Sequence, residues 1–142
     1  MDIVFFDVNS KWYAHALKLR DAVLRKPLGL SFTQEELKRD EHDLHVAAIE
    51  NGKLLACLTL SDTGDKSLKI RQVAVCPQRQ RKGLGTALNT AAEEYARSKG
   101  YVMLYCHARI TAASFYERLG FKRVGEEFTE VTIPHIKMVK IL

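Results

Sequence analysis

The sequence has no long hydrophobic run and few cysteines, and both absences exclude classes of protein. No apolar stretch approaches the roughly 20 residues that cross a membrane, so we expect no transmembrane helix. The cysteines Cys57, Cys76 and Cys106 are odd in number and lack Cys-x-x-Cys spacing, which is typical of reduced thiols rather than a disulfide scaffold. Asp2 stands where a signal peptide would carry positive charge. We therefore expect a cytoplasmic protein.

Internal repeats, low-complexity tracts and linker-like segments are also absent, so residues 1–142 are expected to form a single domain. Lysine and arginine total 22 against 17 acidic residues, a net charge of +5. Such a surplus suits nucleic acid, an acidic membrane or a phosphorylated ligand. The bases gather near Arg71–Lys82, without a basic tail and without interleaved aromatic residues. We therefore expect neither nucleic acid nor a membrane as a partner.

The hydrophobic pattern predicts an α/β (α+β) fold with a mixed, mostly antiparallel central sheet, one parallel βαβ unit and helices on both faces. Asn51-Gly52 indicates a hairpin turn, Thr33 and Glu36 a capping box, and Gly100 a helix end. Thr111 is expected to cap a short helix, and residues 101–106 to form a strand that is apolar on both faces. The expected strands are Ile3–Phe6, Leu44–Glu50, Lys53–Ser61, Ser67–Val75, Tyr101–Cys106, Lys122–Phe128 and Pro134–Leu142, and the helices are Ser10–Leu24, one opening at Thr33, Gly83–Lys99 and Ala112–Leu119.

The stretch QRKGLGTAL, residues 80–88, connects a predicted strand to the longest predicted helix. Unpaired amides at a helix start bind anions, and glycines allow a ligand to approach the backbone closely. In a P-loop the lysine follows the second glycine, whereas Lys82 precedes Gly83. The dinucleotide fingerprint needs a third glycine, but position 88 is Leu. Both common phosphate motifs are excluded.

The spacing Gln/Arg-x-x-Gly-x-Gly/Ala, present here as Gln80–Gly85, resembles the pyrophosphate loop of the GNAT superfamily of N-acetyltransferases. The strand IRQVAVCP before it and the later segment AASFYERLGF, residues 112–121, resemble the same family in the same order. The tail EEFTEVTIPHIKM resembles the YjcF-like or ElaA-like branch. The resemblance spans essentially the whole chain.

This resemblance implies the donor, acetyl-CoA, and the residues that hold it. Backbone groups of Val73 and Val75 would pair with the pantetheine arm, and Ser114 could touch the cofactor. Tyr116 would protonate the departing thiolate, a role that suits a phenol with an ordinary pKa near 10. The pyrophosphate would be held by amides of Gln80, Arg81, Lys82, Gly83, Leu84, Gly85 and Thr86.

The acceptor implied by the resemblance is an amine of a small molecule or peptide, attacking directly in a ternary complex. His135 is the first candidate for the general base, with His107, Glu126 and Glu127 as alternatives. The acidic run Glu35, Glu36, Asp40, Glu41 and Asp43 is either a solvated helix face or a border of the acceptor site that favours a cationic amine.

Two further sequence patterns are not expected to form a metal site or a catalytic pair. His42, Asp43 and His45 do not have zinc spacing, so no metal is expected. Cys106 and His107 are neighbours on a strand and point to opposite faces, so they cannot form a nucleophile–base pair. A non-catalytic acyl-CoA-binding regulatory module remains the alternative function, and the terminal strands could support a homodimer.

Overall fold

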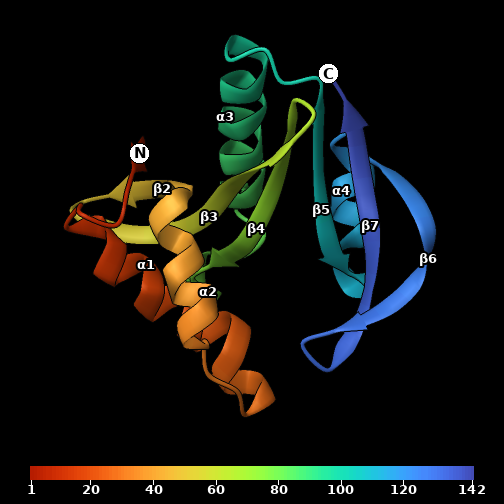
Figure 1. The fold of residues 1–142 in the computed structure, drawn as a ribbon. Coiled ribbons are helices and arrows are strands. Elements are labelled where there is room, and N and C mark those ends of the chain that lie inside the picture. The colour runs from red at the N-terminus through yellow and green to blue at the C-terminus, as the bar shows by residue number, and fades with distance from the viewer.

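The computed structural model describes residues 1–142 and contains one seven-stranded sheet in the order β1-β2-β3-β4-β5-β7-β6. Figure 1 shows this sheet with the first four strands on one side and the last three on the other. The strands are β1 (Asp2–Phe6), β2 (Leu44–Glu50), β3 (Lys53–Gly64), β4 (Ser67–Val75), β5 (Met103–Arg109), β6 (Lys122–Glu130) and β7 (Ile133–Ile141), and the helices are α1 (Trp12–Arg20), α2 (Gln34–Arg39), α3 (Leu84–Ser98) and α4 (Ala113–Arg118).

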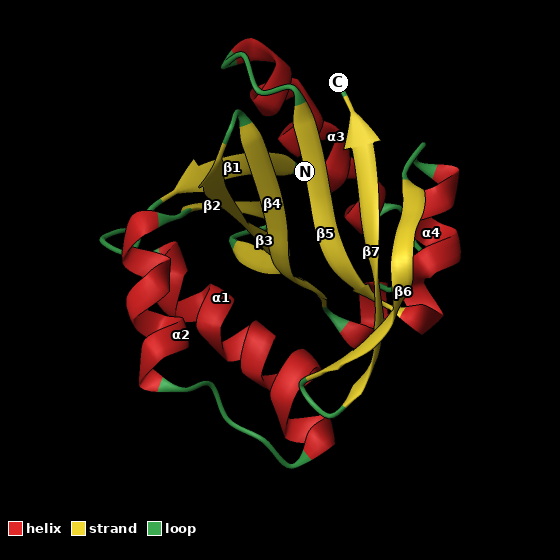
Figure 2. Cartoon of the chain, turned by 45° about the vertical axis from the view of Figure 1, so that its right-hand side comes forward, coloured by secondary structure: helices red, strands yellow, loops and turns green.

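Helices cover the sheet on both sides: α1 and α2 lie on one face, and α3 and α4 on the other (Figure 2). Every strand pair is antiparallel except β4 with β5. The predicted mixed fold with one parallel unit is therefore confirmed. No helix has the length and apolar composition that a membrane span requires.

Two groups of buried side chains form the core, one on each face of the sheet. The larger group includes Leu58, Ile70, Leu88 and Leu104, and packs α3 and α4 onto the strands. The smaller group lies under α1 and includes Ala16 and Cys57.

The parallel strands β4 and β5 pair over only four residues, Ser67–Ile70 with Met103–Cys106. Beyond Ile70 the two strands diverge, which leaves backbone groups of β4 without a partner strand. The strand expected over residues 101–106 lies at Met103–Arg109, and it is central and parallel to β4 as predicted. Alternate residues of β5 are buried, while Tyr105 and His107 on the other face remain partly exposed.

A β-bulge at Gln72 changes which face the residues of β4 present. The three-residue step from Arg71 to Ala74 on β4 opposes the two-residue step from Thr59 to Cys57 on β3. Gln72 has a φ of 54°, as expected for an inserted residue that leaves the ladder. As a result, Arg71 shares a face with Thr59, and Ala74 again shares that face with Cys57.

Two sequence predictions about the helices differ from the structure. The helix expected over Ser10–Leu24 is α-helical only from Trp12 to Arg20, and continues as a wider π-type turn over Asp21–Arg25. The expected Thr111 cap is wrong, because Ala112 precedes α4 and no side chain caps that helix. The Thr33 capping box is confirmed in both directions with Glu36.

The turn between β6 and β7 places two β-branched residues, Val131 (φ 51°) and Thr132 (φ 67°), in the left-handed region. Asn51-Gly52 occupies the same kind of two-residue turn without this strain. We expect Val131→Asn with Thr132→Gly to raise the free energy of unfolding by about 1–2 kcal/mol, because β-branched residues fit this region poorly. Urea unfolding measures it, with Val131→Ala as the control. An unchanged or lower stability would contradict the prediction.

Candidate functional site

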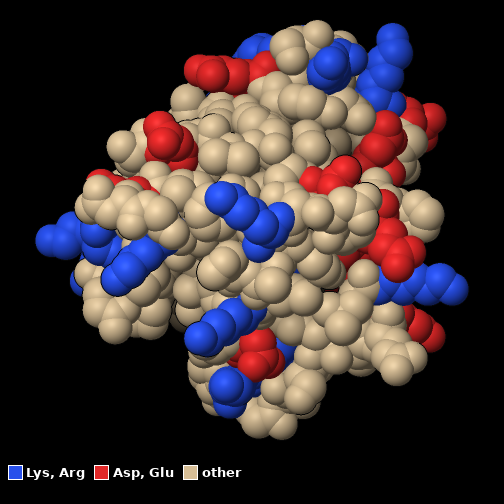
Figure 3. Space-filling model, turned by 90° about the vertical axis from the view of Figure 1, so that its left-hand side faces the viewer, with Lys and Arg blue, Asp and Glu red and all other residues tan.

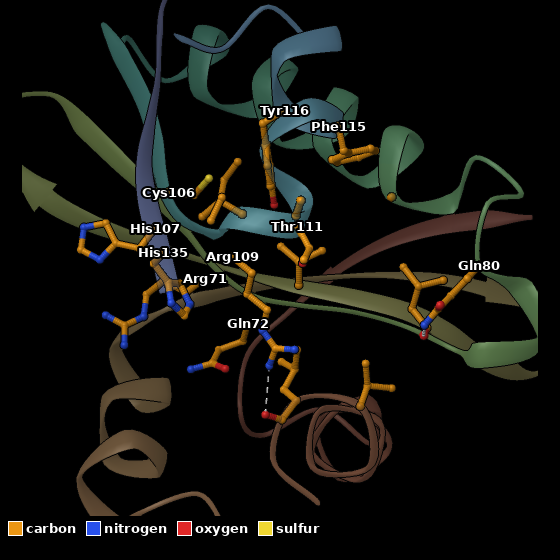
Figure 4. A pocket seen from close by; sticks show the side chains of 18 of the residues that line it. Arg71, Gln72, Gln80, Cys106, His107, Arg109, Thr111, Phe115, Tyr116 and His135 are labelled. Atoms are coloured by element: carbon orange, nitrogen blue, oxygen red, sulfur yellow. Dashed lines mark hydrogen bonds between the residues drawn. The ribbon is translucent and has the colours of Figure 1, made fainter. Parts of the chain in front are cut away.

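A cavity of about 1090 Å³ opens where β4 and β5 diverge. Its loop end is lined by residues that include Val75, Gln80, Gly83 and Gly85, and its far end by Arg25, Glu36, Lys69, Arg71, His107, Arg109, Glu130 and His135. Tyr116 and Thr111 lie between the two ends in Figure 4. One continuous space therefore connects the glycine stretch with a cluster of charged side chains.

The loop end is shaped by two residues in the left-handed region, Arg81 (φ 63°) and Gly83 (φ 85°), directly before α3. When left-handed residues alternate with residues of ordinary φ, successive backbone amides point into the same hollow. This geometry binds anions. A Cβ placed on Gly85 would lie 3.3 Å from Cζ of Phe115. A bare backbone at Gly85 therefore lets α4 pack tightly against the start of α3.

The backbone of β4 is also available to a ligand at the loop end. The carbonyl of Leu55 accepts a hydrogen bond from Cys76 N at 2.8 Å, so the preceding residue, Val75, directs its backbone groups away from β3. Its carbonyl accepts from Gln80 Nε2 at 3.2 Å, and a second lone pair remains free. This contact fixes the loop to the strand.

Most of the residues predicted to bind the cofactor line the cavity, namely Val73, Val75, Gln80, Arg81, Gly83, Leu84, Gly85, Thr86, Ser114 and Tyr116. Lys82 does not line it and is exposed. A direct side-chain role for Lys82 in this cavity is therefore not supported by its position.

Tyr116 is only 5% exposed, and its ring packs edge-on against Phe115 and Phe121. Burial, and then the neighbouring Cys106, raise the pKa of Tyr116 well above its ordinary value. Burial likewise raises the pKa of the Cys106 thiol to about 12. Both groups therefore keep their protons at neutral pH, so Tyr116 is a proton donor and Cys106 is not a thiolate.

His135 lies at the far end, 5% exposed and stacked against Phe128. Its Nδ1 lies 2.9 Å from the carbonyl oxygen of Ile133, so Nδ1 carries the proton and donates it. In the neutral ring Nε2 then holds the basic lone pair. Glu130 Oε2 lies 3.9 Å from Nε2.

The alternative bases are placed differently. His107 also lines the far end, with Nδ1 at 3.1 Å from Glu130 Oε1 and 3.3 Å from Lys69 Nζ. Burial lowers the pKa of His107, against the opposing effect of Glu130. Glu126 and Glu127 are exposed on the edge strand β6 and do not line the cavity. The two histidines on either side of Glu130 are therefore the available bases.

The acidic run does not form one face. Glu35 and Glu41 line a separate shallow hollow between α1 and α2, and Asp40 is buried. Only Glu36 reaches the cavity, where its Oε2 accepts from Arg25 Nη2 at 2.6 Å. Of this run, Glu36 alone therefore contributes a carboxylate to the cavity.

His45 from the rejected metal pattern is buried, and both its ring nitrogens have protein partners. Nδ1 lies 3.1 Å from Thr59 Oγ1, and Nε2 lies 3.0 Å from the carbonyl oxygen of Asp40. Cys106 and His107 do point to opposite faces, as their positions on β5 require. The molecular face in Figure 3 carries acidic and basic side chains side by side, without a continuous basic area.

Sequence comparison assigns the chain to a protein family. Residues 26–142 match the model of the acetyltransferase (GNAT) domain. The chain belongs to the GNAT acetyltransferase family.

Individual relatives agree with this assignment. An acyl-CoA N-acyltransferase from Pseudomonas aeruginosa is 27% identical, with a TM-score of 0.85 and 98% of each chain covered. Escherichia coli ElaA shares the fold at 22% identity, with a TM-score of 0.86 and 99% of each chain covered. YyaT of Bacillus subtilis is 32% identical over 51% of this chain and 49% of its own length. The matching part of the chain thus spans about half the length of that curated relative.

Sequence reasoning missed the charged residues of the far end. Arg71, Arg109 and Glu130 come from β4, β5 and β6, and Arg25 comes from the wider turn after α1. Each is an ordinary charged residue in its own segment. Only their convergence in the folded chain identifies them, and no local motif could have done so.

Proposed function

We propose that this chain is an acetyl-CoA-dependent N-acetyltransferase that transfers the acetyl group to a primary amine in a ternary complex. The observation that carries the proposal is the single cavity, in which Tyr116 lies between the glycine loop and the two histidines of the far end. The family match and the likeness to an acyl-CoA N-acyltransferase support the choice of donor.

In the proposed reaction, amides of residues 80–86 hold the pyrophosphate of coenzyme A, and Val73 and Val75 receive its pantetheine arm. The amine nitrogen attacks the thioester carbonyl, and His135 Nε2 takes the proton that the nitrogen loses. The carbon–sulfur bond then breaks, and the departing thiolate takes the proton of the Tyr116 hydroxyl. Solvent exchange restores both residues.

Steady release of coenzyme A from acetyl-CoA with a panel of primary amines tests the proposal. Calorimetry with acetyl-CoA, ATP and NAD tests donor binding separately. If acetyl-CoA binds but no amine releases coenzyme A, the chain is a non-catalytic acyl-CoA-binding module. If acetyl-CoA is not bound in preference to ATP and NAD, the proposal fails entirely.

The base is tested by His135→Gln, which we expect to lower kcat/KM for the amine about 100-fold or more while acetyl-CoA binding is unchanged. Glutamine keeps a hydrogen-bonding group of similar size but cannot take a proton. His107→Gln is the matched control and should have a much smaller effect. A larger loss of kcat/KM for His107→Gln than for His135→Gln would indicate that His107 is the general base.

The three cysteines form no disulfide, which is consistent with a cytoplasmic location, and this location remains part of the proposal. Binding of nucleic acid is not part of it. A homodimer through an edge strand remains a prediction.

A further inference from the structure

The far end of the cavity has an excess of positive charge. Four cationic side chains line it, Arg25, Lys69, Arg71 and Arg109, against two carboxylates, Glu36 and Glu130. A site built for a simple cationic amine would be expected to carry the opposite balance, since like charges disfavour binding. The excess therefore calls for a compensating anion.

The two carboxylates are already engaged. Glu36 forms an ion pair with Arg25 at 2.6 Å. Glu130 lies between His107, at 3.1 Å, and His135, at 3.9 Å. Neither carboxylate forms an ion pair with Arg71 or Arg109.

Arg71 is half-buried, and its guanidinium takes part in no ion pair or side-chain hydrogen bond of the protein. Burial, and then the nearby charge of Arg39, lower the pKa of Arg71, and the charges of Asp43, Glu130 and Glu36 oppose this shift. Arg109 donates only to a backbone carbonyl, that of Leu24, at 3.2 Å. Burial and then Arg25 lower its pKa as well.

Arg71 also lies away from the glycine loop. Figure 4 shows Arg71 beside His135 and His107, on the opposite side of Tyr116 from Gln80. The basic residues closest to the glycine loop are different ones, Arg79 and Arg81. A guanidinium presents donors in a planar fork that matches a carboxylate or phosphate.

We propose that the acceptor is an amine that also carries an anionic group, and that Arg71, with Arg109 nearby, binds that group while the amine faces His135 and Tyr116. This inference rests on the proposed function and specifies its substrate class. A carboxylate on an amino acid and a phosphate on an amino alcohol provide the same chemistry, and the experiment separates them.

The test measures kcat/KM for two matched pairs, phenylalanine with phenethylamine and phosphoethanolamine with ethanolamine, in the wild-type protein and in Arg71→Gln. Loss of a charge-assisted hydrogen-bonding partner should lower kcat/KM for the anionic member of a pair about 10- to 100-fold. The member without an anionic group should change by less than about 3-fold, since it makes no such contact. The pair that responds identifies carboxylate or phosphate. Differences in amine basicity cancel because each amine is compared with itself.

The control variant is Lys38→Gln, which removes one exposed cation on α2 outside the cavity and should change neither pair. Circular dichroism and the KM for acetyl-CoA verify that Arg71→Gln is folded and loads its donor. Equal losses for both members of a pair would overturn the inference, as would a raised KM for acetyl-CoA, which would place Arg71 in the donor site.

Failure of the inference is distinguishable from failure of the proposed function. If the wild-type protein acetylates phenethylamine and ethanolamine better than phenylalanine and phosphoethanolamine, only the inference fails. If it acetylates none, the proposed function fails, and calorimetry with phenylalanine and phosphoethanolamine in the presence of coenzyme A still tests the site. Binding of either probe that is lost in Arg71→Gln would support the inference, and binding of neither would overturn it.

Discussion

Replacing Tyr116 with Phe is expected to lower kcat about 100- to 10,000-fold, the range associated with loss of a general acid. The substitution keeps the ring that packs against Phe115 and Phe121 and removes only the hydroxyl. The fold and the binding of acetyl-CoA should therefore change little. Pre-steady-state and steady-state release of coenzyme A measure the loss.

The matched control is Tyr101→Phe, which also removes one hydroxyl but at an exposed contact with Asp62 outside the cavity. It should leave kcat unchanged. Because the pKa of Tyr116 lies well above 10, the phenol keeps its proton as the pH rises to 10. Any fall in kcat below pH 10 therefore has another cause and should persist in Tyr116→Phe. Retention of most of the activity in Tyr116→Phe would exclude Tyr116 as the acid.

The second large effect is expected at Asp40, in a buried polar cluster that joins α1, α2 and β2. Asp40 Oδ2 lies 2.9 Å from Arg20 Nη1 and accepts from the Tyr13 hydroxyl at 2.6 Å. The two ion-pair side chains are 1% and 4% exposed, and the guanidinium lies 4.7 Å from the centre of the Phe32 ring. Two further nitrogens of Arg20 have no partner, so the charge depends on Asp40.

We expect Asp40→Asn to lower the free energy of unfolding by about 3–5 kcal/mol, because it leaves Arg20 buried without a counter-charge. Urea denaturation measures this directly. Asp21→Asn, which breaks the exposed ion pair with Lys26 at 3.6 Å, is the matched control and should cost no more than about 1 kcal/mol.

A double variant separates charge from packing at this cluster. Combining Asp40→Leu with Arg20→Met removes both charges, so it should be less destabilised than Asp40→Leu alone. If the double variant were the less stable of the two, or if Asp40→Asn cost under about 1 kcal/mol, the guanidinium would not depend on Asp40 in the way that we describe.

The features that the sequence predicts correctly are those whose physical cause is local. The Asn51-Gly52 turn, the Thr33 capping box and the end of α3 at Gly100 each depend on a few adjacent residues. The glycine loop belongs to the same group, since the helix start and the left-handed φ of Gly83 are encoded in one short stretch. These features do not require knowledge of the rest of the chain.

The features that the sequence does not predict concern neighbours distant in sequence. The apolar run before His107 predicts a central strand, but it does not show that the face of β5 with Tyr105 and His107 stays partly exposed because no helix covers it. The acidic run is compatible with a solvated helix face or with a border of the acceptor site, whereas tertiary contacts bury Asp40 and pair Glu36 with Arg25. Charge pattern along a chain does not determine where each charge is placed in the fold.

At the bulge of β4, Arg71 lies on one face of the sheet, and Val73 and Val75 lie on the other. If Gln72 took a regular place in the ladder, strict alternation would put Arg71, Val73 and Val75 on the same side. Because Gln72 leaves the ladder, Val73 and Val75 pack toward α3 and the larger core, while Arg71 points to the far end of the cavity. Deleting Gln72 would make the pairing regular and would leave each of these residues on its present face. In the proposed function, the side chain at position 71 would contact the acceptor and the backbone of Val73 and Val75 the donor, so a change of side chain at position 71 would leave the donor contacts unaltered.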